Sequence, residues 1–145
     1  MAEIVVDVEI RAPPGTVWKI ISDVDNEPTY WKGTKSVRNI SRQENTIRRE
    51  ITIAFRDQKC MQDVILYPEE KIEAVFTDGI IKGTKTVSME QRGGDGGDGS
   101  VLLRTVWDVK MTGMMGMFTG MLKGHIRNGT EMAMQSIKEA AEKSV

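Results

Sequence analysis

The sequence predicts an α+β fold: a curved antiparallel β-sheet of six or seven strands wrapped around a long C-terminal α-helix, with one or two short helices after the first strand. Three observations support this fold class. An alternating apolar pattern opens the chain, a long middle section alternates between strand patterns and turn signals, and about 30 C-terminal residues show helical spacing. Such a sheet has to bury one face, and the C-terminal helix is the one expected helix long enough to cover it.

The first strand is expected at residues 3–11, where every second side chain is apolar. Its inner face carries Ile4, Val6, Val8 and Ile10. The segment Pro13-Pro14-Gly15 ends this strand, and a helix begins at or just after Pro14, because proline is favoured at the first helical position. Residues 29–31, Thr-Tyr-Trp, follow as a short helix or loop.

Six more strands are expected before the C-terminal helix, separated by short segments rich in Gly, Asp, Asn, Glu or Pro. They cover residues 35–42, 46–55, 58–67, 71–77, 80–91 and 100–111. Connections this short indicate an antiparallel meander. The glycine-rich run 93–99 partly matches one calcium-binding repeat, but such repeats act by stacking, so we expect a hairpin loop.

The C-terminal helix combines methionine and glycine in an unusual way. The inward face expected from spacing consists of Met114, Phe118, Met121, His125, Met132 and Ser136. Glycine recurs at positions 113, 116, 120, 124 and 129, although each glycine inside a helix costs about 0.5–1 kcal/mol relative to alanine. Small positions beside adaptable methionines leave room for a ligand, while close packing of helix on sheet is the alternative explanation.

Composition restricts the function. A chain of 145 residues fits one domain, here residues 1–145, and the net charge of −1 gives no general attraction to nucleic acid. Cys60 is the one cysteine and His125 the one histidine, so we expect no disulfide, metal site or cofactor. With no signal-peptide pattern and no apolar run long enough for a membrane span, a cytoplasmic protein with at most transient membrane contact is expected.

The order of these motifs resembles the START-like helix-grip superfamily, also called SRPBCC, which includes polyketide cyclases, lipid-transport proteins and the birch-pollen allergen. The resemblance rests on the opening strand followed by Ala12-Pro13-Pro14-Gly15-Thr16-Val17-Trp18, on Asp23 leading to Tyr30-Trp31, and on Asp78-Gly79 before a strand rich in Lys and Thr. It extends along the whole chain. It implies a sheet that grips the long helix and leaves a cavity for a lipid, an isoprenoid or quinone, or a polyketide-like molecule.

Ten residues are the candidate ligand contacts in that cavity. They are mostly aromatic side chains or methionines expected on inward faces, together with the one histidine, a candidate hydrogen-bond donor to a ligand carbonyl. The set is Trp31, Phe55, Tyr67, Phe76, Trp107, Met111, Met114, Phe118, Met121 and His125. No catalytic residue is assigned, because only His125 offers acid–base chemistry near neutral pH and no partner for it is evident.

Arg49 is the exception on its strand, because it shares an apolar face with Ile47, Ile51 and Ile53. A charge at such a position has to be paired or to reach solvent. Two explanations stay open at this point: a guanidinium at the cavity mouth that holds an anionic head group, or a register bulge that turns the side chain outward.

Three functions are compatible with this sequence. The first is a carrier or sensor of a hydrophobic small molecule, and we expect this one. The second is a cyclase- or dehydratase-type enzyme acting on such a molecule, which needs an acid–base pair in the cavity. The third is a protein-interaction module, which would expose an apolar patch instead of enclosing a void. The oligomeric state is left open.

Overall fold

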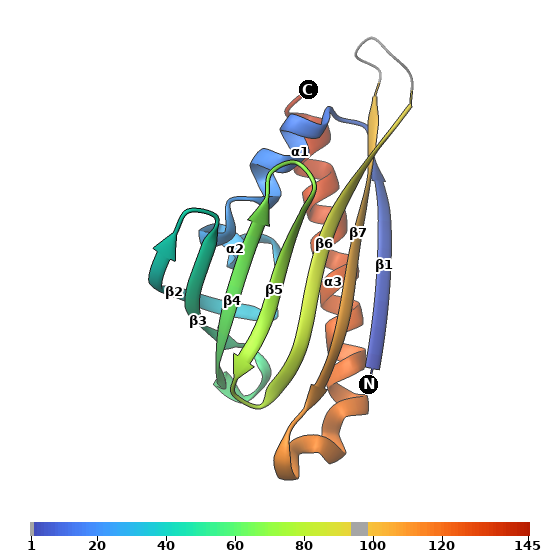
Figure 1. The fold of residues 1–145 in the computed structure, drawn as a ribbon. Coiled ribbons are helices and arrows are strands. Elements are labelled where there is room, and N and C mark those ends of the chain that lie inside the picture. Colours follow the sequence, from blue (N-terminus) through green and yellow to red (C-terminus); the bar gives the residue numbers. More distant parts are fainter. Residues whose placement is uncertain (1, 94–98) are drawn as a thin grey trace.

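The computed structural model describes residues 2–93 and 99–145, which form one seven-stranded sheet and a set of helices (Figure 1). Neighbouring strands are all antiparallel, in the spatial order β1-β7-β6-β5-β4-β3-β2. The strands are β1 (Ala2–Ile10), β2 (Thr34–Gln43), β3 (Thr46–Ile53), β4 (Lys59–Tyr67), β5 (Lys71–Asp78), β6 (Ile81–Arg92) and β7 (Ser100–Met111). The predicted meander is therefore confirmed, with β1 added beside β7.

The short helices expected after β1 and the long C-terminal helix are present, and the C-terminal helix has 25 residues. The helices are α1 (Pro14–Ile21), η1 (Val24–Asn26), α2 (Glu27–Tyr30), η2 (Phe55–Asp57), η3 (Gly113–Phe118) and α3 (Thr119–Lys143). Two of the short helical turns, η2 after β3 and η3 after β7, were not predicted. The predicted α+β helix-grip architecture is confirmed. The glycine-rich loop predicted at 93–99 lies largely outside the described residues.

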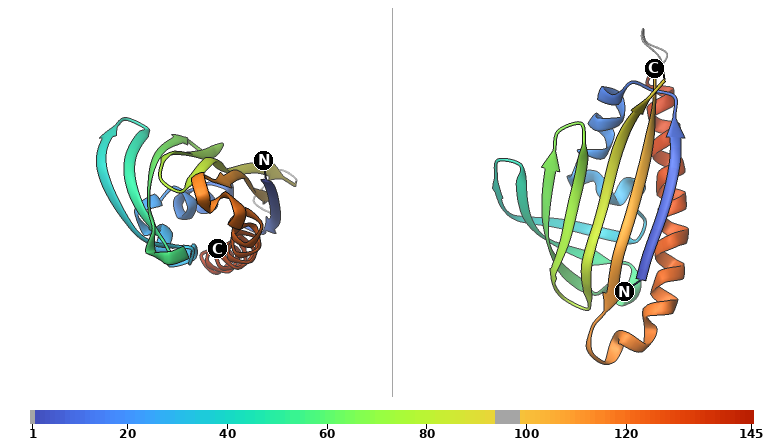
Figure 2. Two further views of the ribbon diagram at one scale, coloured as in Figure 1. Left: turned by 90° about the horizontal axis from the view of Figure 1, so that it is seen from below. Right: turned by 45° about the vertical axis from the view of Figure 1, so that its right-hand side comes forward.

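The sheet is strongly curved, and its concave side holds the helices (Figure 2). Helix α3 runs along β1 and β7, and α1 and α2 lie inside the curve. A glycine in β6 allows the backbones of β6 and β7 to lie unusually close together. Gly83 has φ +126°, and a Cβ built there would lie 2.0 Å from the backbone oxygen of Asp108 on β7. Only glycine fits this backbone conformation at such a distance.

The core is built by the alternating inward residues of the strands. One buried cluster fills the region between β1, β6, β7, α1 and the C-terminal half of α3. Its members are Ile10, Ala12, Val17, Val87, Val101, Leu103, Met134, Ile137 and Ala141. Strand β3 ends at Ile53, two residues before the predicted end, because Arg56 and Asp57 adopt left-handed backbone angles and turn the chain.

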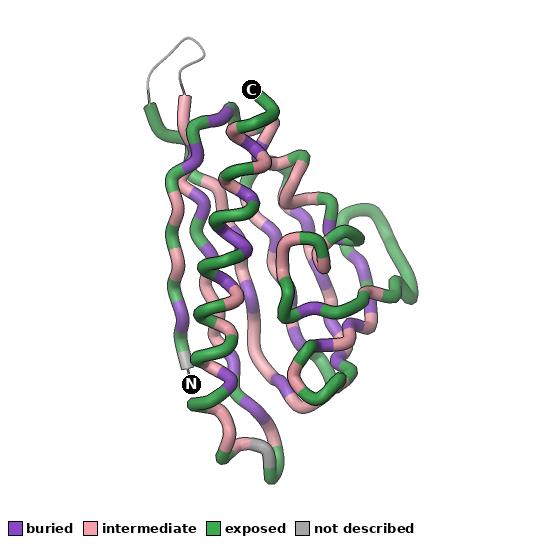
Figure 3. Tube along the Cα trace, turned by 180° about the vertical axis from the view of Figure 1, so that it is seen from behind, coloured by how far each residue is buried: buried purple, intermediate pink, exposed green. Residues whose placement is uncertain are grey.

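The predicted inward face of the C-terminal helix is wrong by about one residue. Met114, Met121 and Met132 are exposed, as are His125 and Ser136. The side chains of α3 that are buried are Leu122, Thr130, Ala133, Met134, Ile137 and Ala141 (Figure 3). Counting methionine as apolar produced a false stripe, since this flexible side chain tolerates exposure, while the true stripe includes small residues and a threonine.

Candidate functional site

A cavity of about 470 Å³ lies between the sheet and the N-terminal half of α3. Its walls come from α2, β2, β3, β4, β6, β7, the η2 turn and α3. The apolar and aromatic lining residues are Trp31, Ile51, Ile53, Ala54, Phe55, Ile81, Trp107, Leu122 and Ile126. The polar, charged and glycine positions are Glu27, Lys32, Gly33, Thr34, Arg56, Gln62, Lys85, His125, Gly129 and Thr130.

Two tryptophans shape the deep part of this cavity. The indole Nε1 of Trp107 donates a 3.0 Å hydrogen bond to the Thr130 hydroxyl, which in turn donates to the backbone oxygen of Ile126 at 2.6 Å. This chain ties β7 to α3 and satisfies the polar edge of a half-buried indole. Trp31 meets Trp107 edge-on with ring centroids 6.5 Å apart, and Phe76 stacks on Trp107 at 6.2 Å. The orientation of Trp107 is thus fixed from three sides.

The structure brings four of the ten candidate ligand contacts to this cavity: Trp31, Phe55, Trp107 and His125. His125 is an exposed residue, so it stands at the opening instead of in the interior. Three others, Phe76, Met111 and Phe118, belong to the hydrophobic cluster beside the cavity and are not among its lining residues.

The remaining three candidate contacts lie elsewhere. Tyr67 is half-buried on the strand face opposite to Leu66, and Lys71 Nζ lies 4.9 Å from its ring centroid. Met114 and Met121 are 92% and 56% exposed, which removes them from the interior. Gly120 and Gly124 are also exposed and do not line the cavity, whereas Gly129 does. Of the helical glycines, Gly129 is therefore the one that borders the space.

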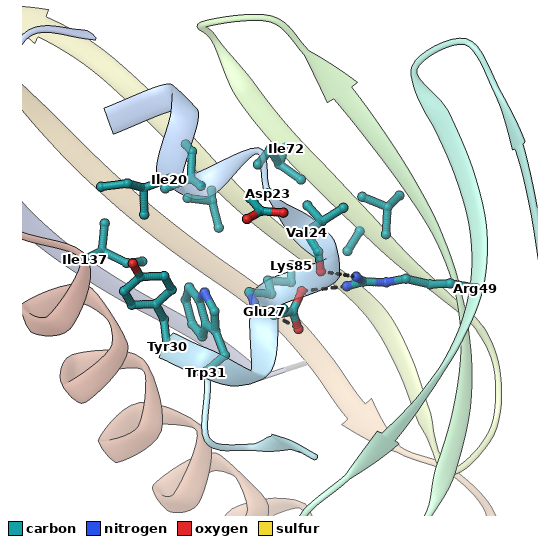
Figure 4. Close-up of a pocket in the computed structure, with 14 residues that line it drawn as sticks. Ile20, Asp23, Val24, Glu27, Tyr30, Trp31, Arg49, Ile72, Lys85 and Ile137 are labelled. Atoms are coloured by element: carbon teal, nitrogen blue, oxygen red, sulfur yellow. Dashed lines mark hydrogen bonds and ion pairs between the residues drawn. The ribbon is translucent and has the colours of Figure 1, made fainter. Parts of the chain in front are cut away.

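A buried charged cluster stands beside the cavity, centred on Glu27 (Figure 4). Arg49, only 1% exposed, donates from Nη2 to Glu27 Oε1 at 2.6 Å, from Nε to Gln62 Oε1 at 2.9 Å and from Nη1 to the backbone oxygen of Val24 at 3.1 Å. Strand β3 pairs with β4 without a register shift at this point, and the shift beside Arg49 lies in β2, between Asn39 and Ser41, and does not turn Arg49 outward. Both open explanations for Arg49 are corrected: it is neither at the mouth nor turned outward, but paired in the interior.

Lys85 is the second buried cation of this cluster, on β6. Its Nζ lies 4.0 Å from Glu27 Oε2, and that oxygen already accepts a 2.8 Å hydrogen bond from the Thr34 hydroxyl. The ammonium lies 3.3 Å from the ring centroid of Trp31 and 5.0 Å from that of Trp107, which are cation–π distances. Lys85 borders both the 470 Å³ cavity and a small void of about 40 Å³, whose lining residues Figure 4 shows.

The cluster divides into a fixed ion pair and a titratable amine. Burial raises the pKa of Glu27, but the charges of Lys85 and Arg49, with hydrogen bonds from Arg49 and Thr34, outweigh burial and hold this pKa at about 2. Burial lowers the pKa of Lys85 to about 8, and the nearby Arg49 charge acts in the same direction against the attraction of Glu27. Glu27 is thus a permanent anion at neutral pH, and the pKa of Lys85, at about 8, lies near neutrality.

Sequence reasoning missed Glu27, Gln62 and Lys85. A usable signal exists for the lysine, because Lys85 alternates with Ile81 and Val87 on the inward face of β6, just as Arg49 alternates with Ile47 and Ile51 on β3. Two cations on inward faces require a buried anion. The identity of that anion is not readable from strand patterns, because Glu27 lies in a turn-rich segment with several carboxylates.

The family comparison agrees with this architecture. Residues 1–142 match the family described as polyketide cyclase / dehydrase and lipid transport. The chain belongs to this family. Among solved structures, the protein TTHA0849 from Thermus thermophilus has a similar fold. It superposes on this chain with a TM-score of 0.80 and 14% identity, and 99% of both chains is covered. A search of curated proteins found no significant match.

Two further solved structures resemble this family member. A START superfamily protein from Mycobacterium smegmatis superposes with a TM-score of 0.74, 21% identity and 99% of both chains covered. The aromatase/cyclase Zhui from a Streptomyces species superposes with a TM-score of 0.74 and 15% identity, covering 98% of this chain and 94% of that one. At these identities the likeness establishes the START-like fold.

Two features are absent from the described part of the chain. None of its helices combines the length and hydrophobicity that crossing a membrane requires. Residues 2–93 and 99–145 also hold no group of three or more His, Cys, Asp or Glu side chains arranged to bind a metal ion.

Proposed function

We propose that this protein binds a hydrophobic small molecule in the 470 Å³ cavity between the sheet and α3, and carries or senses it. The observation that carries the proposal is the cavity itself. Its volume lies within the range of about 300–1,000 Å³ typical of sites for drug-sized ligands. About half of its lining residues are aliphatic or aromatic and most of its wall surface is apolar, with polar and charged groups making up the rest, and a mostly apolar wall is usual for such sites.

Packing energetics favour a ligand over an empty core. Buried apolar voids destabilise proteins in proportion to their volume, so a well-packed interior leaves few of them. The C-terminal half of α3 obeys this rule, with Ala133, Ile137 and Ala141 almost fully buried. In the N-terminal half, the partly buried Gly129 lines the cavity, and a Cβ built there meets no atom within 4 Å outside its own helix. A ligand supplies the contacts that the chain leaves unmade.

The test is a pair of matched substitutions on one helix. Gly129→Leu places a side chain at the cavity wall, whereas Gly124→Leu adds the same side chain at an exposed position with no neighbour within 4 Å. Both replace a helical glycine, so both gain about the same helix propensity, roughly 0.5–1 kcal/mol. Binding is measured by fluorescence titration with the uncharged probe N-phenyl-1-naphthylamine.

Gly129→Leu is expected to weaken probe binding at least about tenfold, the effect of filling a site of limited volume, and Gly124→Leu to leave it unchanged. Native mass spectrometry of the purified parent then identifies any molecule retained from the host. Equal affinity in both variants, with both folded by circular dichroism, would mean that the probe does not occupy this cavity.

A second candidate function is a reaction on the bound molecule, of the cyclase or dehydratase type. The observation that favours it is Lys85, a buried amine with a pKa of about 8 at the cavity wall, in a fold shared with an aromatase/cyclase. An ammonium beside a ligand carbonyl stabilises the enolate that forms when an adjacent carbon loses a proton to hydroxide or a buffer base that enters from solvent.

Deuterium uptake tests this second candidate. 2-Dodecanone is incubated with the protein in D2O, and exchange of the hydrogens next to its carbonyl is followed by mass spectrometry. An enzyme of this type accelerates the exchange, and Lys85→Met removes the acceleration. If exchange is no faster than in protein-free buffer, the second candidate is wrong and ligand binding without a reaction is the proposed function.

A further inference from the structure

The charges enclosed beside the cavity do not balance. Arg49 and Lys85 each contribute one positive charge, and Glu27 is the one carboxylate of the described residues that lies within 4.0 Å of either, while Asp23, which lines the small void with them, is exposed to solvent. One of the two enclosed positive charges is therefore left without a carboxylate of its own. Burying an uncompensated charge is costly, and buried charges in proteins are normally paired. We propose that the cavity takes an amphiphilic acid, whose single anionic group binds the Lys85 ammonium while its apolar body fills the space between the sheet and α3.

The free hydrogen-bonding capacity lies on Lys85. All three nitrogens of the Arg49 guanidinium donate to fixed partners, and both oxygens of Glu27 accept hydrogen bonds from Arg49 or Thr34. The Lys85 ammonium donates no hydrogen bond to any described residue, at a distance of 4.0 Å from Glu27, although its side chain is only 7% exposed. An ammonium has three donors, so an anion from the cavity side can accept without breaking the existing pair.

The opening of the cavity has the same sign of charge. Lys32 and Arg56 are exposed, positively charged lining residues, and Glu27 is the one acidic residue that the structure places in the lining. Arg56 lies over the rings of Phe55 and Phe118, at 5.7 and 5.8 Å from their centroids, so its positive charge stands at the rim. A positive rim leading to a positive interior group attracts and orients an anionic ligand.

The ligand class follows from the two parts of the site. Two tryptophans and several aliphatic side chains surround an apolar body, and the one unbalanced ammonium meets one anionic group. A carboxylate on an alkyl chain or on fused rings satisfies both. This inference rests on the proposed ligand-binding function and adds the chemical class of the ligand.

The experiment compares two molecules that differ in the charge of their head group. Dodecanoate and 1-dodecanol share the same chain length, and each is titrated at pH 7 against protein loaded with N-phenyl-1-naphthylamine. Charge-assisted hydrogen bonds contribute about 1.5–3 kcal/mol, so dodecanoate is expected to displace the probe at roughly 10- to 100-fold lower concentration than the alcohol.

Two lysine variants locate the charge that causes the preference. Lys85→Met keeps the length and apolar stem of the side chain and removes its charge. Lys82→Met, the matched control, lies on the same strand three residues earlier, where its ammonium donates to the backbone oxygen of Thr77. Both variants lower the net charge of the protein equally. The preference for dodecanoate is expected to disappear in Lys85→Met and to persist in Lys82→Met.

Each outcome decides the matter. Equal displacement by acid and alcohol in the parent protein overturns the inference, and needs no variant to do so. A preference that survives in Lys85→Met also overturns it and assigns the effect to the rim. If dodecanoate, the alcohol and the probe all fail to bind, the proposed ligand-binding function itself is wrong. That result differs from equal binding of acid and alcohol, which contradicts only the charge argument.

Discussion

The two halves of α3 cover two different interiors. Residues from Thr130 onwards bury Ala133, Met134, Ile137 and Ala141 against β1, β7 and α1, and apart from the void of about 40 Å³ that Ile137 borders this region is filled by side chains. Residues before Thr130 border the 470 Å³ cavity, and Met121 in this half points to solvent. One continuous helix therefore packs in the core along its second half and lines the cavity along its first half. The backbone is helical throughout, so the difference between the halves comes from their side chains.

The sequence of the helix encodes this difference. Glycine occupies positions 120, 124 and 129 in the first half, whereas alanine occupies positions 133, 140 and 141 in the second. Glycine lowers helix propensity by about 1 kcal/mol relative to alanine, so the first half is the less stable one on intrinsic grounds. The charged cluster stands at the boundary, because Glu27 and Lys85 border both the cavity and the small void.

The largest expected loss of stability comes from replacing a member of the charged cluster. Glu27→Leu leaves Arg49 as a buried charge without its partner and is expected to lower the free energy of unfolding by about 3–5 kcal/mol. Adding Arg49→Met removes the orphaned charge, so the double variant is expected to be more stable than Glu27→Leu alone. Urea denaturation followed by circular dichroism measures both. A double variant whose loss equals the sum of the two single losses would show that the pair is not coupled.

A smaller effect separates the two halves of α3 directly. Ile137→Ala removes a side chain that is 1% exposed in the filled region, and about 3 kcal/mol of stability is expected to be lost. Ile126→Ala removes the same atoms from a half-buried residue that already faces the cavity, and about 1 kcal/mol is expected. Thermal and urea denaturation of this pair provide the measurement. Equal losses would mean that both halves are packed alike.

The remaining prediction is a change of stability with pH. The pKa of Lys85 is about 8 in the folded protein and 10.5 for the unperturbed side chain, so the unfolded state binds more protons between these values. The contribution of Lys85 to the free energy of unfolding is therefore expected to increase as the pH rises from about 8 to 10.5, which stabilises the folded protein. The difference between the parent and Lys85→Met in urea denaturation isolates it. A difference that is constant across this window would contradict a buried, destabilised ammonium.

Much of the fold could be predicted from the sequence, because strands and turns leave local signals. The alternation of Val101, Leu103 and Thr105 and the proline-led start of α1 placed their elements within a residue or two. The helix face was missed for a physical reason: Met121 and Met132 are apolar by composition yet exposed, while Thr130 is buried because its hydroxyl is satisfied by Ile126 and Trp107.

The site was less accessible to prediction. Aromatic content identified Trp31, Phe55 and Trp107 as cavity residues, but nothing local distinguishes them from Phe76, which packs in the neighbouring core. The pairing of Glu27 with Arg49 joins residues 22 positions apart through the fold. Such a contact depends on how α2 sits inside the curved sheet, and a linear pattern does not record that arrangement.

The close approach at Gly83 bears on how this protein can evolve. Any other residue there would collide with the backbone of Asp108, so this position of β6 is closed to substitution. Substitution of Gly83 would therefore disrupt the backbone arrangement of the sheet at this point and not reshape it. A descendant that turns to a new ligand has to do so through the side chains around the cavity, such as Trp31, Phe55 and Lys85, and those are the positions to randomise in a directed-evolution library.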